Sequence, residues 1–209
     1  MRAMIRRFEE RWAVYFVPQP DELLARLGRI WFAAHGHTPY LASPRQYGFH
    51  ATLKAPFDMT AAGLLLSARR LALRLDPVVL PSLRAVAMGR YLALTPEQPC
   101  PAVAALAQSL VVGLDFFRVP AQRHWVGLTP RQRQNARRWG YPWTGRDYHF
   151  HMTLAGPFAS MPVAAWLENA QQHFAPLAQQ RVVIDTISLC RQPTAGVPFS
   201  EVVRLPLGG

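Results

Sequence analysis

The stretch Tyr47-Gly48-Phe49-His50-Ala51-Thr52-Leu53-Lys54-Ala55-Pro56-Phe57 returns later in the chain as Tyr148-His149-Phe150-His151-Met152-Thr153-Leu154-Ala155-Gly156-Pro157-Phe158. Aligned without gaps, seven of the eleven positions are identical: Tyr, Phe, His, Thr, Leu, Pro and Phe. Both copies alternate apolar with polar residues, are rich in aromatic and β-branched side chains, and close on a proline, which predicts two strands. The repeat keeps a polar His-x-Thr pair inside an apolar frame, which favours a shared chemical role over duplicated core alone.

The strand period assigns each residue of the repeat to one of two faces, because successive side chains on a strand point in opposite directions. In the first copy the core face is expected to hold Tyr47, Phe49, Ala51 and Leu53, and the opposite face His50, Thr52 and Lys54. In the second copy the core face is expected to hold Tyr148, Phe150, Met152 and Leu154, and the opposite face His149, His151 and Thr153. Each copy therefore presents an imidazole and a hydroxyl side by side.

These groups suit catalysis on an anionic tetrahedral centre. A pair of facing imidazoles can divide the work near neutral pH, since one neutral ring accepts a proton and one charged ring donates one. The hydroxyls of Thr52 and Thr153 can donate to the non-bridging oxygens of a phosphate, and Lys54 adds positive charge on the same face. Base, acid and anion stabilisation are then all present, so the sequence predicts a phosphate-ester site that needs no metal or other cofactor.

The order of predicted elements indicates a duplicated α+β fold. Each His-x-Thr strand is followed by a helix and then by two strands. The predicted strands are 11–17, 47–57, 78–88, 90–95, 147–155, 181–190 and 199–206, and the predicted helices are 21–34, 58–75, 102–117, 130–139 and 162–179. A Gly/Ser-rich linker is absent from the sequence, so residues 1–209 are expected to form one bilobed unit, with lobes centred on 47–57 and 148–158 and an arginine-rich connection around 118–146.

Two motifs of the form H-x-T-h, where h is apolar, stand about a hundred residues apart in this duplicated chain: His50-Ala51-Thr52-Leu53 and His151-Met152-Thr153-Leu154. In this the chain resembles the two-histidine (2H) phosphoesterase superfamily. The chain is more narrowly similar to a bacterial subfamily encoded beside phosphonate-utilisation (carbon–phosphorus lyase) genes. This similarity lies in the first repeat, in Trp139-Gly140-Tyr141-Pro142 and in the second motif.

The resemblance implies two pseudo-twofold-related antiparallel sheets with helices outside and a central cleft. It implies metal-independent hydrolysis of a cyclic phosphodiester or a related RNA end, with His50 and His151 as the catalytic pair and Thr52 and Thr153 as phosphate-binding hydroxyls. In the phosphonate context it suggests a phosphoribosyl cyclic phosphate as substrate. His149, Tyr47 and Tyr148 are accessory candidates in the same motifs. Which histidine is the base stays open at this stage.

The amino-acid composition narrows the classes of protein to which the chain can belong. Half of the 209 residues are apolar and 17% are charged, which is typical of a globular protein. Residues 1–9 lack the apolar core of a signal peptide, no apolar run has the length of a membrane span, and the two cysteines are too few for a disulfide framework. A cytoplasmic protein without membrane contact and without an obligate protein partner is expected.

The formal net charge of +11 favours anionic partners. Between Phe116 and Arg146 the chain has seven arginines and no acidic residue: Arg118, Arg123, Arg131, Arg133, Arg137, Arg138 and Arg146. This stretch is either a solvated basic face or a nucleic-acid patch, and its aromatic residues, Trp125, Trp139, Tyr141 and Trp143, would suit a single strand. RNA-end processing, or RNA binding without turnover, is therefore the alternative function.

Two further interpretations compete for the histidines. His149 and His151 share a strand face and would form a metal pair if Asp147 or a remote carboxylate supplied a third ligand. The first repeat has Gly48 at the position of His149, so the duplication does not support this role. A histidine in either motif could also be a hydrogen-bonded core residue. Retention of the His-x-Thr spacing in both copies favours the catalytic interpretation.

Overall fold

Nine strands in two sheets lie within the residues that the computed structural model describes, which are 10–59, 62–120, 124–158 and 163–208. The strands are β1 (Arg11–Phe16), β2 (Ala51–Asp58), β3 (Val78–Leu80), β4 (Leu83–Met88), β5 (Tyr91–Pro96), β6 (Met152–Ala155), β7 (Val182–Ile184), β8 (Thr186–Gln192) and β9 (Ser200–Pro206). The α-helices are α1 (Leu23–His35), α2 (Ala42–Tyr47), α3 (Leu64–Ala72), α4 (Pro101–Gly113), α5 (Pro130–Trp139) and α6 (Val163–Phe174).

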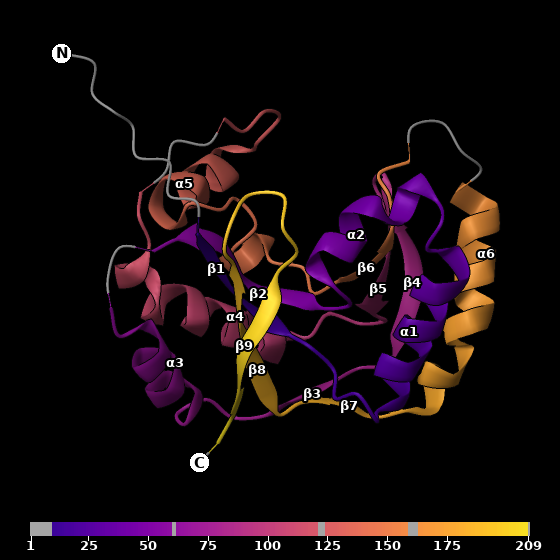
Figure 1. The fold of residues 1–209 in the computed structure, drawn as a ribbon, viewed down its shortest axis with the longest axis horizontal. Helices are drawn as coiled ribbons and strands as arrows, with labels where there is room; N and C mark the ends of the chain where they lie inside the picture. Colours follow the sequence, from indigo (N-terminus) through magenta and orange to yellow (C-terminus); the bar gives the residue numbers. More distant parts are fainter. Residues whose placement is uncertain (1–9, 60–61, 121–123, 159–162, 209) are drawn as a thin grey trace.

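The larger sheet is antiparallel, with strand order β4-β5-β6-β2-β1-β8-β9, and it consists of two halves. One half is β4-β5-β6 and the other is β2-β1-β8-β9, and they meet where β6 pairs with β2 (Figure 1). The predicted α+β class with antiparallel sheets and outer helices is confirmed. The structure adds that the sheets of the two halves join edge to edge at the two His-x-Thr strands.

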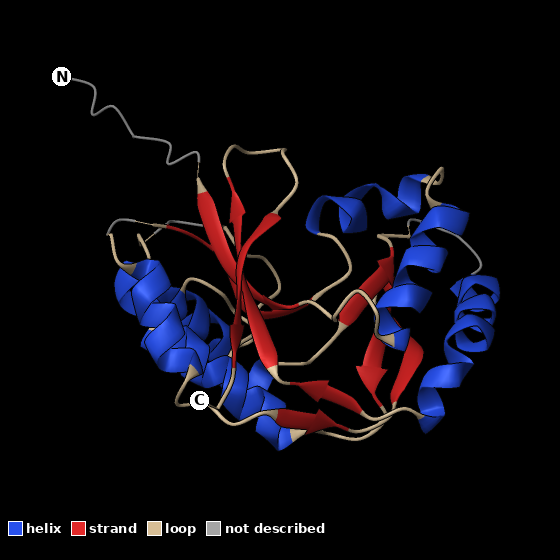
Figure 2. Ribbon diagram, turned by 60° about the horizontal axis from the view of Figure 1, so that its bottom comes forward, coloured by secondary structure: helices blue, strands red, loops and turns tan. Residues whose placement is uncertain are grey.

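The helices cover the outer sides of both halves (Figure 2). Helices α3 and α4 pack on the half that contains β2 and β8, whereas α1 and α6 pack on the half that contains β4 and β6. The N-terminal helix α1 thus belongs to the opposite half from β1, and the C-terminal hairpin β8-β9 returns to the half of β1 and β2. A third, two-stranded unit, β3 with β7, runs between the halves.

The predicted strand 78–88 is interrupted. It ends as β3 at Leu80 and resumes as β4 at Leu83, because Pro81 lacks the backbone N–H that a continuous ladder needs. The hairpin predicted at Gly89 is confirmed, since β4 and β5 pair from Met88 and Tyr91 outward and Gly89 has φ of 59°. Helix α5 is also confirmed, with a capping box at Thr129 and a left-handed Gly140 at its end.

Both His-x-Thr strands start later than the alternation predicts. The segment between the predicted helix 21–34 and the first of these strands contains α2, which ends at Tyr47, and Gly48 with φ of 71° then turns the chain so that β2 starts at Ala51. A short 3₁₀ turn, Gly145–Asp147, precedes the second copy, and β6 starts at Met152. The predictions that fall on residues 1–9, on residues 60–61 of the predicted helix 58–75, on Pro162 at the start of the predicted helix 162–179, and on Arg123 lie outside the described residues. Within the described part of the chain, no helix has the length and apolar character needed to cross a membrane.

Candidate active site

The site is built on one pair of residues, Ala51 of β2 and Met152 of β6, which lie opposite each other in the antiparallel register. Both side chains are fully buried on the core face. Because one step along an antiparallel pair moves in opposite directions on the two strands, this register places His50 across from Thr153 and Thr52 across from His151. The two repeats therefore meet with their polar faces on the same side, and all four of these side chains are half-buried.

Both imidazoles are anchored in the same way. Nδ1 of His50 lies 3.0 Å from the carbonyl oxygen of Gly48, and Nδ1 of His151 lies 2.9 Å from that of His149. A carbonyl only accepts, so Nδ1 of each ring carries the hydrogen and Nε2 is left for chemistry. Nε2 of His50 lies 3.3 Å from Oγ1 of Thr52, whose hydroxyl therefore points toward the reactive nitrogen.

A cavity of about 510 Å³ opens beside these strands. Thr52, Thr153, His151, His149 and Tyr148 line it. His50 is not among the lining residues, and its Nε2 lies 3.3 Å from the Oγ1 of Thr52, which is one of them. The other walls come from β2, the β4–β5 turn, α4 and the segment before β6: Leu53, Ala55, Met88, Gly89, Tyr91, Ala107, Gln108, Val111, Tyr141, Trp143, Thr144, Gly145 and Asp147. Most of this surface is apolar or aromatic, and its polar groups come from the two motifs and from Gln108, Thr144 and Asp147.

The three accessory candidates occupy different places. The hydroxyl of Tyr148 donates to the carbonyl oxygen of Thr52 at 3.1 Å, which ties the second repeat to the first. His149 is exposed at the cavity wall, and its carbonyl anchors His151. Tyr47, which the alternation placed on the core face of a strand, instead ends α2, and its ring lies 6.1 Å from that of His50.

Burial is the main cause of the pKa shifts of His50 and His151. It lowers the pKa of His50 from the usual 6.5 to about 4; the Gly48 carbonyl opposes this shift, and the nearby His151 reinforces it. Burial also lowers the pKa of His151, against the favourable contact with the carbonyl of His149. Both rings are therefore neutral near pH 7. A bound phosphate anion would favour the protonated form of one of them, as acid–base catalysis requires.

Lys54 is not brought to this cavity. The predicted shared face of His50, Thr52 and Lys54 is wrong for Lys54, because the register of β2 against β1 shifts at Leu53: Thr52 pairs with Tyr15, whereas Lys54 pairs with the core residue Val14. The Nζ of Lys54 donates to the carbonyl oxygen of Val111 at 3.1 Å and lies 3.9 Å from Oδ1 of Asp115, and the residue is 3% exposed. Burial lowers the pKa of Lys54 to about 8, with Asp115 opposing the shift. These contacts indicate a structural role, and a phosphate-binding role for Lys54 remains a prediction from the sequence.

Lys54→Met tests the two roles. We expect kcat/KM to stay within about threefold of the wild type, because the amine already has partners away from the cavity. Replacing a buried charge by an apolar side chain of similar length is often neutral for stability, and Asp115 keeps its ion pair with Arg118 at 2.7 Å. Steady-state kinetics and a urea titration measure both effects. A loss of more than about tenfold in kcat/KM at unchanged stability would instead place Lys54 on the substrate phosphate.

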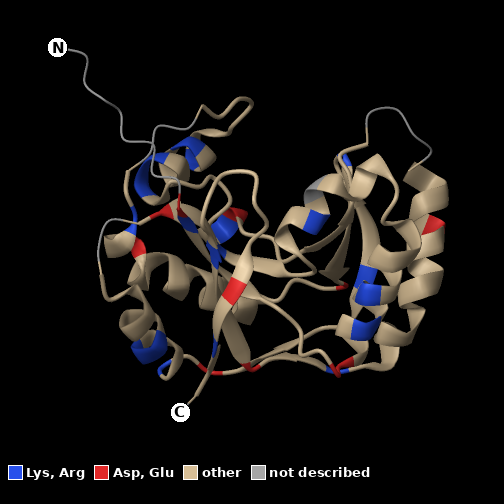
Figure 3. Ribbon diagram, viewed as in Figure 1, with Lys and Arg blue, Asp and Glu red and all other residues tan. Residues whose placement is uncertain are grey.

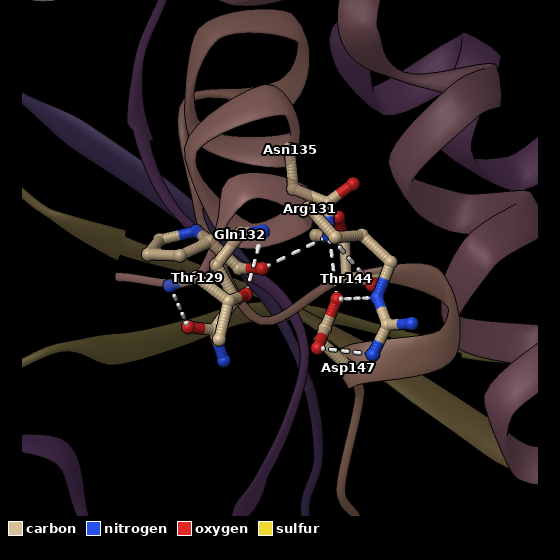
Figure 4. Close-up of polar contacts among 7 residues, drawn as sticks. Thr129, Arg131, Gln132, Asn135, Thr144 and Asp147 are labelled. Carbon is tan, nitrogen blue, oxygen red and sulfur yellow. Dashed lines mark hydrogen bonds and ion pairs between the residues drawn. The ribbon is translucent and has the colours of Figure 1, made fainter. Parts of the chain in front are cut away.

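A polar network holds the segment before the second motif (Figure 4). Arg131 of α5 makes a bidentate pair with Asp147, with N···O distances of 2.6 and 2.9 Å. Asn135 donates to Asp147, and also to the carbonyl oxygens of Pro142 and Thr144. The hydrogen bonds from Arg131 lower the pKa of Asp147, so the carboxylate stays charged and paired. Helix α5 thereby fixes the 141–149 wall of the cavity.

Fewer arginines of the 118–146 stretch are therefore available to an anionic partner than the sequence suggests. Acidic residues stand immediately before and after it: Asp115 pairs with Arg118, and Asp147 pairs with Arg131. The remaining arginines of α5, which are Arg133, Arg137 and Arg138, are exposed on a basic helix (Figure 3). No group of three His, Cys, Asp or Glu side chains within the described residues has the geometry to hold a metal ion.

Sequence reasoning missed several residues around the site. Tyr141 and Trp143 line the cavity, and Trp125 packs against them edge-on, with ring centroids 6.0 and 5.4 Å away. The sequence grouped these rings with an RNA-binding segment, and only the fold shows that they form a cavity wall. Tyr15 of β1 lies directly against His50, with ring centroids 3.9 Å apart, and carries no motif that would have identified it.

Comparison with known proteins places this geometry in context. The model of a family described as "Protein of unknown function (DUF1045)" matches residues 52–200. A protein of Janthinobacterium sp. (strain Marseille), named ribose 1,5-bisphosphate phosphokinase PhnN, is 33% identical over 95% of this chain and 51% of its own length. A protein of the same name from Laribacter hongkongensis (strain HLHK9) is 30% identical over 90% of this chain and 50% of its own length. The chain thus spans about half the length of these curated relatives.

Solved structures share the fold at low sequence identity. E. coli LigT complexed with NADP+ has a TM-score of 0.56 at 15% identity, covering 96% of this chain and 99% of that one. A crystal structure described only as a phosphoesterase has a TM-score of 0.52 at 16% identity, with the same coverage. The fold implied by the resemblance to the 2H phosphoesterases is therefore confirmed, and the phosphonate-associated subfamily stays a prediction from the sequence motifs.

Proposed function

The chain belongs to the family described as "Protein of unknown function (DUF1045)", and on that premise we propose that it is a metal-independent phosphodiesterase that hydrolyses a small cyclic phosphodiester. The observation that supports the proposal is the Ala51–Met152 register, which brings two equally anchored imidazoles and two hydroxyls together, with Thr52, Thr153 and His151 lining one cavity. This set contains a base, an acid and two hydrogen-bond donors for a phosphate.

The proposed reaction has one displacement step. Nε2 of one histidine takes a proton from water, the water oxygen bonds to phosphorus, and the phosphorus–oxygen bond of the ring breaks. Nε2 of the other histidine protonates the departing oxygen, so a cyclic diester becomes an open monoester that retains a hydroxyl. Thr52 and Thr153 donate to the non-bridging oxygens, where charge gathers in the transition state.

The names of the curated relatives support a sugar phosphate as the substrate. A protein named ribose 1,5-bisphosphate phosphokinase acts on ribose 1,5-bisphosphate, and this chain matches about half of each such relative. Hydrolysis of a 5-phosphoribosyl 1,2-cyclic phosphate at the bond to O2 yields ribose 1,5-bisphosphate. An enzyme that makes the compound and an enzyme that consumes it are natural neighbours in one polypeptide. We therefore favour a phosphoribosyl cyclic phosphate as the substrate.

A second candidate is an RNA-end 2′,3′-cyclic phosphodiesterase. It is favoured by the aromatic wall, in which Tyr141 and Trp143 line the cavity and offer faces on which a base can stack. The exposed arginines of α5 lie on the helix that holds this wall. An RNA substrate that contacts several phosphates loses affinity steeply as salt rises, whereas a small cyclic phosphate shows a shallow dependence.

The deciding experiment is an activity panel on EDTA-treated protein. The substrates are 5-phosphoribosyl 1,2-cyclic phosphate, 2′,3′-cyclic nucleotides and short RNAs with a 2′,3′-cyclic end, and the products are identified by phosphorus NMR. We expect the cyclic phosphate signal of the ribosyl substrate to be replaced by that of ribose 1,5-bisphosphate. Preference for the RNA would move the assignment to the second candidate, and a lack of turnover on the whole panel would remove the proposal.

A further inference from the structure

The two histidines, although anchored alike, have different surroundings. Aromatic rings from separate parts of the chain enclose His50. The ring of Tyr15 on β1 lies 3.9 Å from it, and the ring of Tyr47 at the end of α2 lies 6.1 Å from it. Phe199, in the connection between β8 and β9, packs on both tyrosines, at 5.5 Å from Tyr47 and 5.7 Å from Tyr15. We call Tyr15, Tyr47 and Phe199 the aromatic enclosure.

Hydrogen bonds hold the β8–β9 connection in this place. The backbone N–H of Phe199 donates to the carbonyl oxygen of Gln46 in α2 at 2.9 Å. The buried Gln192 donates to the carbonyl oxygen of Val197 and accepts from Arg11 at 2.7 Å, and the guanidinium of Arg11 lies over the Phe199 ring at 5.6 Å. The connection bends over β1 and β2 toward α2 (Figure 1), so the C-terminal hairpin completes the surroundings of a residue in the first repeat.

His151 lies on the open side of the site. Its ring lines the cavity, next to the exposed His149 and across the strand pair from Thr52. Within residues 10–59, 62–120, 124–158 and 163–208 we find aromatic ring contacts to His50 and none to His151. An anion in the cavity therefore meets the ring of His151 directly, whereas His50 is approached through Nε2 beside the Thr52 hydroxyl.

Among the residues that the structure describes, the groups that we find around His50 offer no negative charge to stabilise a protonated ring. They are the phenols of Tyr15 and Tyr47, the thiol of Cys190 behind Tyr15, the guanidinium of Arg11 over Phe199, and His151. Burial raises the pKa of Tyr15 well above its usual value and that of Cys190 to about 12, so neither is an anion near neutral pH. The same burial holds the pKa of His50 at about 4, and the ring stays neutral.

We propose that the aromatic enclosure positions His50 as the base that takes the proton from the attacking water, and that His151 is the acid that protonates the leaving oxygen. This division of roles rests on the proposed function. Tyr15, Tyr47 and Phe199 are positioning residues, because they act on the substrate only through His50. After the step, the protonated His50 and the deprotonated His151 exchange protons with solvent and the site is reset.

The enclosure is tested first without any substrate, by NMR titration of the histidine ring protons, with the signal of His50 identified by its loss in His50→Gln. In the intact protein we expect His50 to titrate far below 6.5. Tyr15→Leu and Phe199→Leu should move its pKa upward by about one unit or more, because the ring becomes hydrated. Tyr15→Phe keeps the ring and removes only a buried hydroxyl that has no partner among the described residues, and should keep the low pKa.

The division of roles is tested by leaving-group chemistry. A 4-nitrophenyl phosphodiester releases an anion that needs no proton, so His151→Ala should recover to within about tenfold of wild-type kcat on that ester, whereas His50→Ala should not. The acidic limb of the plot of kcat/KM against pH has an apparent pKa. In Tyr15→Leu and Phe199→Leu this apparent pKa should move upward together with the pKa of His50.

Two results overturn the proposal: an intact protein in which His50 titrates near 6.5, and recovery of His50→Ala in place of His151→Ala on the nitrophenyl ester. Failure of the proposed function would look different. The wild type would then turn over no phosphodiester while His50 still titrated low. That outcome would remove the assignment of base and acid and leave only the positioning of the ring.

Discussion

Replacement of either His50 or His151 by alanine should lower kcat on the cyclic phosphodiester by about 10²–10⁴-fold, the usual contribution of a positioned acid or base. The reason is geometric. Each ring has Nδ1 committed to a backbone carbonyl, which leaves Nε2 for proton transfer, and neither repeat can supply a second imidazole in the same position. His149 lies two residues from His151, but it is exposed on the cavity wall and has no counterpart in the first repeat.

The fold should tolerate both changes. The two rings are half-buried and each makes one hydrogen bond to the backbone, so the loss of stability should be about 1 kcal/mol. His37→Ala is the matched control, since His37 is exposed and is not among the residues that line the cavity. Circular dichroism and a thermal melt establish folding, and initial rates on EDTA-treated protein measure kcat. Wild-type kcat in either active-site variant would contradict the two-histidine mechanism.

Much of this site could be predicted from the repeat alone. The alternation of polar and apolar residues put Ala51 and Leu53 in the core and His50 and Thr52 on the opposite face, and the burial of these residues agrees. A duplicated chain also favours a pseudo-twofold pairing of its two copies. The sequence does not reveal that the pairing is centred on Ala51 and Met152, because register is set by contacts across the sheet.

What could not be predicted depends on residues far apart in the chain. Tyr15 and Phe199 approach His50 only because β1 lies between β2 and β8 and the β8–β9 connection bends back to α2. Lys54 faces the core because the register of β2 shifts between Thr52 and Lys54, and its Nζ then reaches the carbonyl oxygen of Val111 in α4, 57 residues later in the chain. The strand starts were misplaced because Gly48 and the Gly145 turn change the backbone direction, which side-chain alternation does not register.

Helix α1 packs on the opposite half from β1, and this crossing leads to the other large expected effect, the loss in the free energy of unfolding caused by Trp31→Ala. Trp31 is completely buried on α1 and joins that helix to the half formed by the second repeat. Its Nε1 donates to the carbonyl oxygen of Leu154 on β6 at 3.0 Å, and its ring packs against those of Trp166, His173 and Phe174. Removing a buried aromatic ring of this kind costs about 3–5 kcal/mol in the free energy of unfolding.

Trp31→Phe separates the two parts of that cost. It retains most of the packing and loses the hydrogen bond to Leu154, so the destabilisation should be about 1–3 kcal/mol, the cost of leaving one buried acceptor without its partner. Urea titrations followed by circular dichroism give both values. Because Trp31 does not line the cavity, the folded fraction of either variant should keep the kcat of the wild type at low temperature. A loss below about 1 kcal/mol in Trp31→Ala would show that α1 is not the element that secures the second repeat.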